Sequence, residues 1–462
     1  MKQLKELLGD SIIYGLGSFL LKATQIFVLP LILFFLKKDE FGTLDYFLSL
    51  KNILVIIYGW GILTSIFKFT NSSLRKDHVA FNGFLVVVTI TGIGLLISLL
   101  CFLIPEISIY WKEIIYIHLI STFAAFMSIP LGIYRQRREP LKYILVNVVY
   151  TIVFLGGSYF LLLTSELSYL AILLGHLFAS IIAFVIGTIG VIKYIRFRFE
   201  KELFKRMLDF GFSILLNSLS FVLVLGTMRF FLKINGTFDD VGILGMAQRL
   251  SLFVGALLIS PFTLAWLPFV KSHYQKYDFK ETVNRVFTIF LWVGLFFCFS
   301  LELLQNDFFD LIKNYEYREA TNYVLPLSFS YLLQGFYFIF SAGIFLADTT
   351  TKYKVIGVIV PIFNVVLYGI FLNKISINFV TYISLLSFLL ATIMAYVYGN
   401  KRLGVKLFRF RNLFIIGLYI VLFIGISILE SKTNYSLEML ISKLLFIIVL
   451  LGAHVLVEFK RK

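Results

Sequence analysis

Residues 17–35 read GSFLLKATQIFVLPLILFF, an apolar run with one charged residue, Lys22, in its interior. A run of this length can cross the hydrocarbon core of a membrane as a helix. A lysine near the centre of such a helix costs roughly 2.5–3.5 kcal/mol on insertion scales, and residues of this kind usually face a cavity or a protein partner. The stretch therefore indicates a membrane helix whose charged residue faces a cavity or a protein partner.

The composition extends this interpretation to the whole chain. Of the 462 residues, 59% are hydrophobic and 15% are charged, and the mean hydropathy is +0.91. Soluble proteins carry far more charge. The apolar segments predict an all-α polytopic membrane protein with about fourteen transmembrane helices. We expect them at roughly 11–36, 43–69, 79–104, 113–134, 142–163, 168–193, 210–232, 241–268, 283–304, 322–346, 354–372, 376–398, 412–430 and 437–457.

The net charge is +16, and the distribution of the basic residues along the chain matches a membrane topology. An even number of helices puts both termini on one side, and with that side cytoplasmic the inner loops hold most of the lysines and arginines. YRQRREPLKY (134–143), KYIRFRFEKELFKR (193–206) and KRLGVKLFRFR (401–411) are the clearest cases. This is the positive-inside pattern, so the basic excess indicates orientation rather than a nucleic-acid partner. Binding of membrane lipids by the same loops is the second interpretation.

The sequence offers no sign of catalytic chemistry. The loops between expected helices are too short for a soluble domain, so we expect no enzyme activity. Cys101 and Cys298 lie in apolar segments, which argues against a disulfide framework. The five histidines are scattered without metal-ligand spacing, and no metal or cofactor is expected. Since no GxxxxGK[ST] motif is present, any driving force is expected from an H⁺ or Na⁺ gradient or the membrane potential.

Two short similarities suggest an internal duplication. DEFGTLDYF (39–47) matches DDVGILGMA (239–247), and PLKY (140–143) matches TTKY (350–353). They predict two six-helix lobes, helices 1–6 and 7–12, followed by helices 13 and 14. Parallel repeats of this kind place their substrate between the lobes near the midplane. The expected domain bounds are 1–206, 207–400 and 401–462.

Within the twelve expected lobe helices, four basic residues lie at least three positions from either end, all in the first two helices of a lobe: Lys22, Lys51, Arg229 and Arg249. Acids in these helices are few, so a cavity lined by the four would suit an anion. Each also has an alternative role. Arg229 lies near the end of its helix and can snorkel outward, and Lys51 can pair with an acid elsewhere.

Several ordered segments resemble the oligosaccharide (Wzx-type) flippases of the multidrug/oligosaccharidyl-lipid/polysaccharide (MOP) exporter superfamily. GLGSFLLKATQIFVLPLILFFLKKDEFG is similar to the family's first helix and hairpin, and LDFGFSILLNSLSFVLVLGTMRFFL resembles the seventh helix. VGILGMAQRLSLFVGALLISPFTLAWLPF resembles the eighth, and YEYREATNYVLPLSFSYLLQGFY the tenth. One position departs from the family, which often has an Asp before the arginine of the seventh helix. Here Met228 precedes Arg229, which puts an ion pair within that helix in doubt.

The resemblance implies two lobes forming a V around a central cavity. It also implies translocation of a polyprenyl-pyrophosphate-linked oligosaccharide across the bacterial plasma membrane for O-antigen, capsule or exopolysaccharide synthesis. Lys22, Lys51 and Arg249 would contact the pyrophosphate, with Arg229 nearer the outer mouth. Side chains expected to bind sugar hydroxyls are Tyr14, Ser18, Gln25, Asn217 and Gln248. Pro30, Pro261 and Pro268 can bend the first and eighth helices.

Other functions remain open from the sequence. A flippase for a lipid-linked peptidoglycan precursor has the same carrier chemistry, a multidrug exporter of the superfamily would need deep acids, and a membrane glycan polymerase usually has a large outer loop. Asp45 and Glu302 are the expected carriers of a coupling ion, although both lie near helix ends. Expected partners are the lipid-linked glycan, membrane lipids, and a glycan polymerase and glycosyltransferases of the same pathway.

Overall fold

The structure is a computed structural model of the 462-residue chain, and it describes residues 24, 27–72, 78–137, 139–346, 351–430 and 437–459. Every regular element in these ranges is a helix. Eleven helices in the described residues are long and apolar enough to cross a membrane, and the apolar stretches Phe410–Gly425 and Leu440–Gly452 are shorter. The prediction of an all-α polytopic membrane protein is confirmed.

The first half of the chain forms a helical bundle that we call the N lobe. Its second expected helix is divided into α3 and α4, because Trp60 and Gly61 both have positive φ, 41° and 64°. Most of the first expected helix lies outside the described residues. The elements of this lobe are α2 (Leu29–Phe35), α3 (Lys38–Gly59), α4 (Ile62–Ser72), α5 (Val79–Cys101), α6 (Pro105–Ser108), α7 (Trp111–Gln136), α8 (Pro140–Thr164) and α9 (Tyr169–Ile189).

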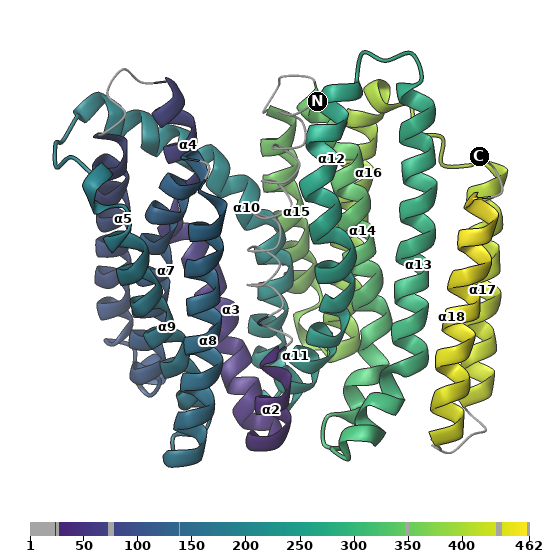
Figure 1. The fold of residues 1–462 in the computed structure, drawn as a ribbon. Coiled ribbons are helices and arrows are strands. Elements are labelled where there is room, and N and C mark those ends of the chain that lie inside the picture. The colour runs from purple at the N-terminus through teal and green to yellow at the C-terminus, as the bar shows by residue number, and fades with distance from the viewer. Residues whose placement is uncertain are drawn as a thin grey trace.

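The short helix η2 (Ile192–Tyr194) leads to a second bundle, which we call the C lobe. Its elements are α10 (Lys201–Asn235), α11 (Phe238–Phe253), η3 (Val254–Ile259), α12 (Ser260–His273), α13 (Phe279–Ile312), η4 (Arg318–Ala320), α14 (Thr321–Phe345), α15 (Thr351–Ile370), η5 (Leu372–Lys374) and α16 (Ile377–Leu403). Two further helices, α17 (Phe410–Glu430) and α18 (Leu437–Phe459), lie at its far side (Figure 1). The expected domain bounds at 206 and 400 stay a prediction.

The apolar core has three parts. One belongs to the N lobe and includes Ile62 and Val86, and a second belongs to the C lobe and includes Val283 and Phe388. The third is shared, because Phe41 of α3 packs in the same cluster as residues of α11 and α14. In Figure 1 the two bundles stand side by side, and α2, α3 and α11 approach one another near the lower end. The lobes are therefore joined by a common core at that end.

Two glycines make this joint possible. A Cβ on Gly42 would collide with the carbonyl of Phe238, and a Cβ on Gly242 would collide with the carbonyl of Lys38. The two contacts are reciprocal, since each glycine meets the residue four positions before the other. These residues belong to the two similar segments 39–47 and 239–247, or directly precede them. Only glycine at both positions lets the backbones of α3 and α11 pack this closely.

The hydrogen-bonding pattern changes within the eighth expected helix. It consists of α11, a π-helical turn at Val254–Ile259, and α12. Pro261 follows in the first turn of α12, where it lacks an N–H to donate. Pro268 lies inside α12, and Pro30 lies in the first turn of α2. A π-turn therefore directly precedes Pro261, and the bends expected at the three prolines stay a prediction.

An asparagine in the N lobe holds the segment that links the lobes. The Nδ2 group of Asn82, on α5, donates to the carbonyl of His78 at 2.8 Å and to the carbonyl of Arg198 at 3.1 Å. Its Oδ1 accepts a hydrogen bond from the N–H of Glu200 at 3.0 Å. The side chain is fully buried. It therefore fixes the backbone just before α10 begins.

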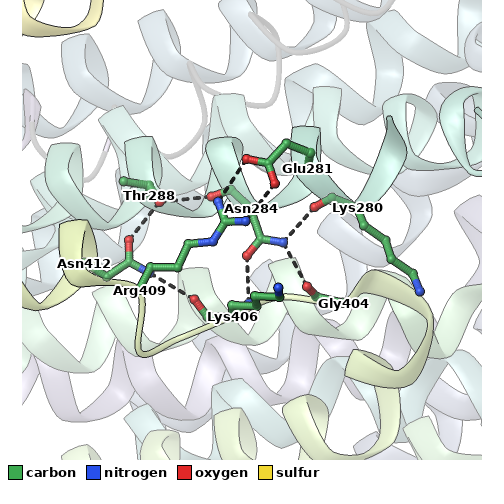
Figure 2. A network of polar contacts seen from close by, with 8 residues as sticks. All are labelled: Lys280, Glu281, Asn284, Thr288, Gly404, Lys406, Arg409 and Asn412. Atoms are coloured by element: carbon green, nitrogen blue, oxygen red, sulfur yellow. Dashed lines mark hydrogen bonds and ion pairs between the residues drawn. The ribbon is translucent and has the colours of Figure 1, made fainter. Parts of the chain in front are cut away.

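Asn284 on α13 makes the same three bonds in the C lobe, as Figure 2 shows. Its Nδ2 donates to the carbonyls of Lys280 (2.7 Å) and Gly404 (2.8 Å), and its Oδ1 accepts from the N–H of Lys406 (2.7 Å). We call the two arrangements the Asn82 clamp and the Asn284 clamp. The Asn82 clamp ties the start of α5 to the segment that follows α9. The Asn284 clamp ties the start of α13 to the segment that follows α16.

Candidate functional site

Asp45 of α3 forms ion pairs with two arginines of the C lobe. Its Oδ2 accepts a hydrogen bond from Nε of Arg229, on α10, at 2.5 Å. Its Oδ1 lies 3.7 Å from Nη2 of Arg249, on α11. The three residues are 5%, 6% and 8% exposed, respectively. We call them the Asp45 cluster, and its charges join one lobe to the other.

The surroundings of the cluster explain how three charges fit into this space. Gly245 faces Asp45, and a Cβ there would lie 2.7 Å from the carboxyl carbon. The guanidinium of Arg249 lies over the ring of Phe41, 5.1 Å from its centroid. Arg229 also donates through Nη1 to the carbonyl of Leu225 at 2.8 Å. Each charged group therefore has a polar or aromatic neighbour that offsets part of the cost of burial.

The cluster carries more positive than negative charge. Two guanidinium groups face one carboxylate, so its formal charge is positive. Arginine binds carboxylate and phosphate oxygens with the same planar fork, so an anionic ligand can replace Asp45 as a partner. The arrangement is suited to exchange one anion for another at the boundary between the lobes.

Lys51 lies on the same helix as Asp45, further from the joint. With a rise of 1.5 Å per residue the two are roughly 9 Å apart along the axis of α3. The side chain is half-buried, and no carboxylate in the described residues lies within ion-pair distance of it. Arg249 is close enough for the two positive charges to interact. Lys51 and Arg249 together form a cationic region next to the Asp45 cluster.

A histidine that the sequence did not single out as a site residue lies near this region. His176 of α9 interacts electrostatically with both Lys51 and Arg249. Its Nδ1 is 2.7 Å from the hydroxyl of Tyr150, on α8, and the ring of Phe154 stacks on it at 3.8 Å. His176 and Tyr150 extend the polar region into the N lobe. The sequence gave no indication that the two residues form a pair, because they lie on different helices and at no distinctive spacing.

The structure answers the alternatives for Arg229. The side chain is buried and does not snorkel toward a helix end. It has an acidic partner, although not within its own helix, because Asp45 on α3 takes the place left by Met228. The ion pair of Arg229 is therefore formed between helices and not within one helix. The glycines that precede Arg249 on α11 allow close approach, since Gly242 meets a backbone and Gly245 meets Asp45.

Other expected site residues divide into three groups. Gln248 is half-buried on α11, and its Nε2 is 3.5 Å from the hydroxyl of Tyr331. Glu302 is half-buried on α13, five residues before Asp307, and is not a partner of Asp45. Residues outside the described part are Tyr14, Ser18, Lys22 and Gln25, together with the side chain of Asn217.

Metal-ligating side chains do not gather anywhere in the described residues. No group of three or more His, Cys, Asp or Glu side chains there could hold an ion. Cys101 and Cys298 are free, as expected for residues in apolar helices. The described part of the site therefore consists of cations, one carboxylate, and hydroxyl, amide and imidazole groups.

A comparison with protein families identifies the chain. Residues 7–273, more than half of its length, match the model of the polysaccharide biosynthesis protein family. The chain belongs to this family, and it is a multi-pass membrane protein. Among curated protein sequences no match is found.

The fold is shared with solved membrane transporters. The lipid II flippase MurJ in an inward closed conformation superposes with a TM-score of 0.75 at 14% identity, covering 98% of this chain and 100% of that one. An inward-facing MATE family multidrug transporter of the MOP superfamily gives a TM-score of 0.61 at 14% identity, covering 85% and 94%. The MATE multidrug transporter DinF-BH gives 0.62 at 15%, covering 87% and 97%. At this identity the similarity shows the fold, which is that of flippases and exporters.

Proposed function

We propose that this protein is a flippase that moves a polyprenyl-pyrophosphate-linked oligosaccharide across the bacterial plasma membrane for surface polysaccharide synthesis. The observation that carries the proposal is the excess of cations between the lobes. In the described residues, Lys51, Arg229 and Arg249 lie near only one carboxylate, that of Asp45, which pairs with the two arginines. A diphosphate has the charge and oxygen geometry that this set can bind. Lys22 would add a fourth cation from the first helix.

Binding and movement are coupled in this proposal through Asp45. In the substrate-free state, Asp45 holds Arg229 and Arg249 and thereby keeps the lobes together. A diphosphate at Lys51 and Arg249 competes with Asp45 for the guanidinium groups. The inter-lobe ion pairs then weaken, and the lobes can separate at the end where Gly42 meets Gly242. Protonation of Asp45, or a change in membrane potential, would weaken the same contacts.

The sugar and the lipid tail require different surroundings. Hydroxyl and amide groups near the cations, including Gln248 and Tyr331, would bind sugar hydroxyls. The polyprenyl chain would stay in the bilayer and leave through the gap between lobes. With cytoplasmic termini, the head group would travel from the cytoplasmic leaflet to the outer one.

A lipid-linked peptidoglycan precursor is the second candidate substrate. The superposition with the lipid II flippase MurJ over 98% of this chain favours it, and its diphosphate would use the same cations. The family match to polysaccharide biosynthesis favours the oligosaccharide. Export of organic cations is disfavoured, because the Asp45 cluster together with Lys51 holds three basic groups and one acid.

The experiment is complementation of strains that lack either flippase, with equal membrane levels of each variant. We expect Lys51→Ala and Lys51→Glu to abolish surface polysaccharide, and Lys51→Arg to retain part of it, because only arginine keeps a cation. The same series at Lys22 tests the first helix. Lys205→Ala, an exposed lysine of α10, is the matched control. Wild-type function of all three Lys51 variants would refute the anion site. Rescue of the peptidoglycan strain alone would assign the second substrate.

A further inference from the structure

An open apolar pocket lies in the N lobe, away from the Asp45 cluster. It has a volume of about 100 Å³ and is lined by residues of α5, α7, α9 and the segment 191–197. Its lining includes Phe81, Phe84, Pro130, Phe184 and Phe197. We call it the Phe84 pocket. Beyond Phe84 on the same helix, Val88, Leu95 and Leu96 are exposed. The pocket therefore lies beside a face of α5 that would meet lipid.

Basic residues alternate with the lining residues along segment 191–198. Lys193 follows Ile192, Arg196 follows Ile195, and Arg198 follows Phe197, so a basic residue comes directly after each of these three lining residues. All three basic side chains are exposed. In the described residues no carboxylate lies within ion-pair distance of Arg198. The segment that forms this edge, or rim, of the pocket therefore bears three exposed basic residues.

The Asn82 clamp holds this rim in place. Asn82 binds the carbonyl of Arg198 and the N–H of Glu200, so the backbone at the rim is fixed before any ligand arrives. Phe197 packs edge-on against Phe81, with ring centroids 5.4 Å apart, yet remains 75% exposed. A phenylalanine this exposed is costly in water and favourable at a membrane interface.

The Asn284 clamp provides a contrast within the same chain. There the arginine that follows the clamped segment, Arg409, donates two hydrogen bonds to Glu281, at 3.0 and 2.7 Å, as Figure 2 shows. Its charge is therefore balanced by the protein itself. At the Asn82 clamp the acid Glu200 instead lies 3.7 Å from Nδ1 of His78. Within the part of the chain that the structure describes, the two lobes therefore share a clamp, but Arg409 has a carboxylate at ion-pair distance and Arg198 does not.

We propose that the Phe84 pocket binds one anionic phospholipid of the membrane. An acyl chain would occupy the pocket between Phe84 and Phe197, and the headgroup phosphate would bind Lys193 and Arg198. Apolar lining and a cationic rim at one place match the two parts of such a lipid, and basic residues near a membrane surface select anionic headgroups. Because the segment joins α9 to α10, the bound lipid would stabilise the connection between the lobes.

The test measures lipid retained by the purified full chain in detergent, using native mass spectrometry with phosphatidylglycerol or phosphatidylcholine of identical acyl chains. We expect selective retention of phosphatidylglycerol. Lys193→Gln/Arg198→Gln should lower its affinity by roughly tenfold or more, since each basic residue near the surface contributes about 1 kcal/mol. Lys401→Gln/Lys406→Gln, exposed lysines around the Asn284 clamp, is the matched control and should retain the lipid.

Two further readouts keep the proposal testable whatever the double variant does. Ile192→Trp adds bulk at the pocket wall and should reduce retention of both lipids. The unfolding midpoint of the wild type should rise with phosphatidylglycerol and stay constant with phosphatidylcholine. Equal retention of the two lipids by the wild type would overturn the proposal. So would retention of phosphatidylglycerol by the Lys193→Gln/Arg198→Gln variant at the wild-type level.

Discussion

Nε of Arg229 on α10 donates a 2.5 Å hydrogen bond to Oδ2 of Asp45 on α3, so a buried ion pair crosses from one lobe to the other. The residues are far apart in the chain, and neither helix is next to the other in sequence. In the transport cycle proposed above, the lobes separate and this contact breaks. The ion pair would then link the stability of this state to that cycle.

Asp45→Asn should destabilise the protein and disable it. Removing one partner of a buried ion pair typically costs about 3–5 kcal/mol, because the remaining charge stays buried. The loss should appear as a lower midpoint of thermal unfolding in detergent and as lost complementation. Asp307→Asn is the matched control, since Asp307 is equally buried and pairs with Lys443 of α18 at 2.5 Å, away from the lobe joint. It should lower stability but keep transport. Wild-type transport by Asp45→Asn would contradict the coupling role.

Gly42→Ala should weaken the joint between α3 and α11. The new methyl group would meet the carbonyl of Phe238 and lie 2.9 Å from the N of Gly242, and such overpacking typically costs about 1–3 kcal/mol. Gly92→Ala on α5 is the control, because a Cβ there meets nothing within 4 Å. Its midpoint should stay unchanged or rise slightly. Equal midpoints for both variants would show that the joint is not tightly packed in solution.

Much of the fold followed from the sequence, because apolar length alone identifies membrane helices. Each expected helix from the second to the fourteenth has its counterpart, at bounds within a turn or two in most cases. The similar segments 39–47 and 239–247 also meet in space, at Gly42 and Gly242. Bends were harder to foresee. The break at Trp60 and Gly61 depends on positive φ values in a segment that reads as one apolar helix.

The site was only partly predictable, for a physical reason. Cations in apolar helices are individually conspicuous, so Lys51, Arg229 and Arg249 could be selected from the sequence. Their partners depend on how helices cross, and no spacing rule connects Asp45 with an arginine 184 positions later. His176 and Tyr150 likewise become a pair only when α8 packs against α9.

Removal of either clamp should destabilise its lobe. Asn82→Ala and Asn284→Ala each lose three hydrogen bonds to the backbone, and at about 1 kcal/mol net per bond the loss is roughly 3 kcal/mol. The measurement is the unfolding midpoint together with proteolysis of the segments after α9 and α16. Asn284→Asp is informative because it keeps the acceptor for Lys406 and loses both donations, so it should fall between wild type and alanine. An aspartate variant as stable as wild type would show that the donated bonds contribute nothing.

Tyr150→Phe should reduce transport more than it reduces stability. The change removes only the hydroxyl that bonds His176 at 2.7 Å, at a cost of about 0.5–1.5 kcal/mol, and frees the imidazole to turn relative to Lys51. Tyr159→Phe, on the same helix but 49% exposed, is the matched control. Complementation and unfolding midpoints of the two variants should be compared at equal membrane levels. If Tyr150→Phe lowers the midpoint yet transports like Tyr159→Phe, the pair is structural, and the polar region that serves the substrate ends at Lys51.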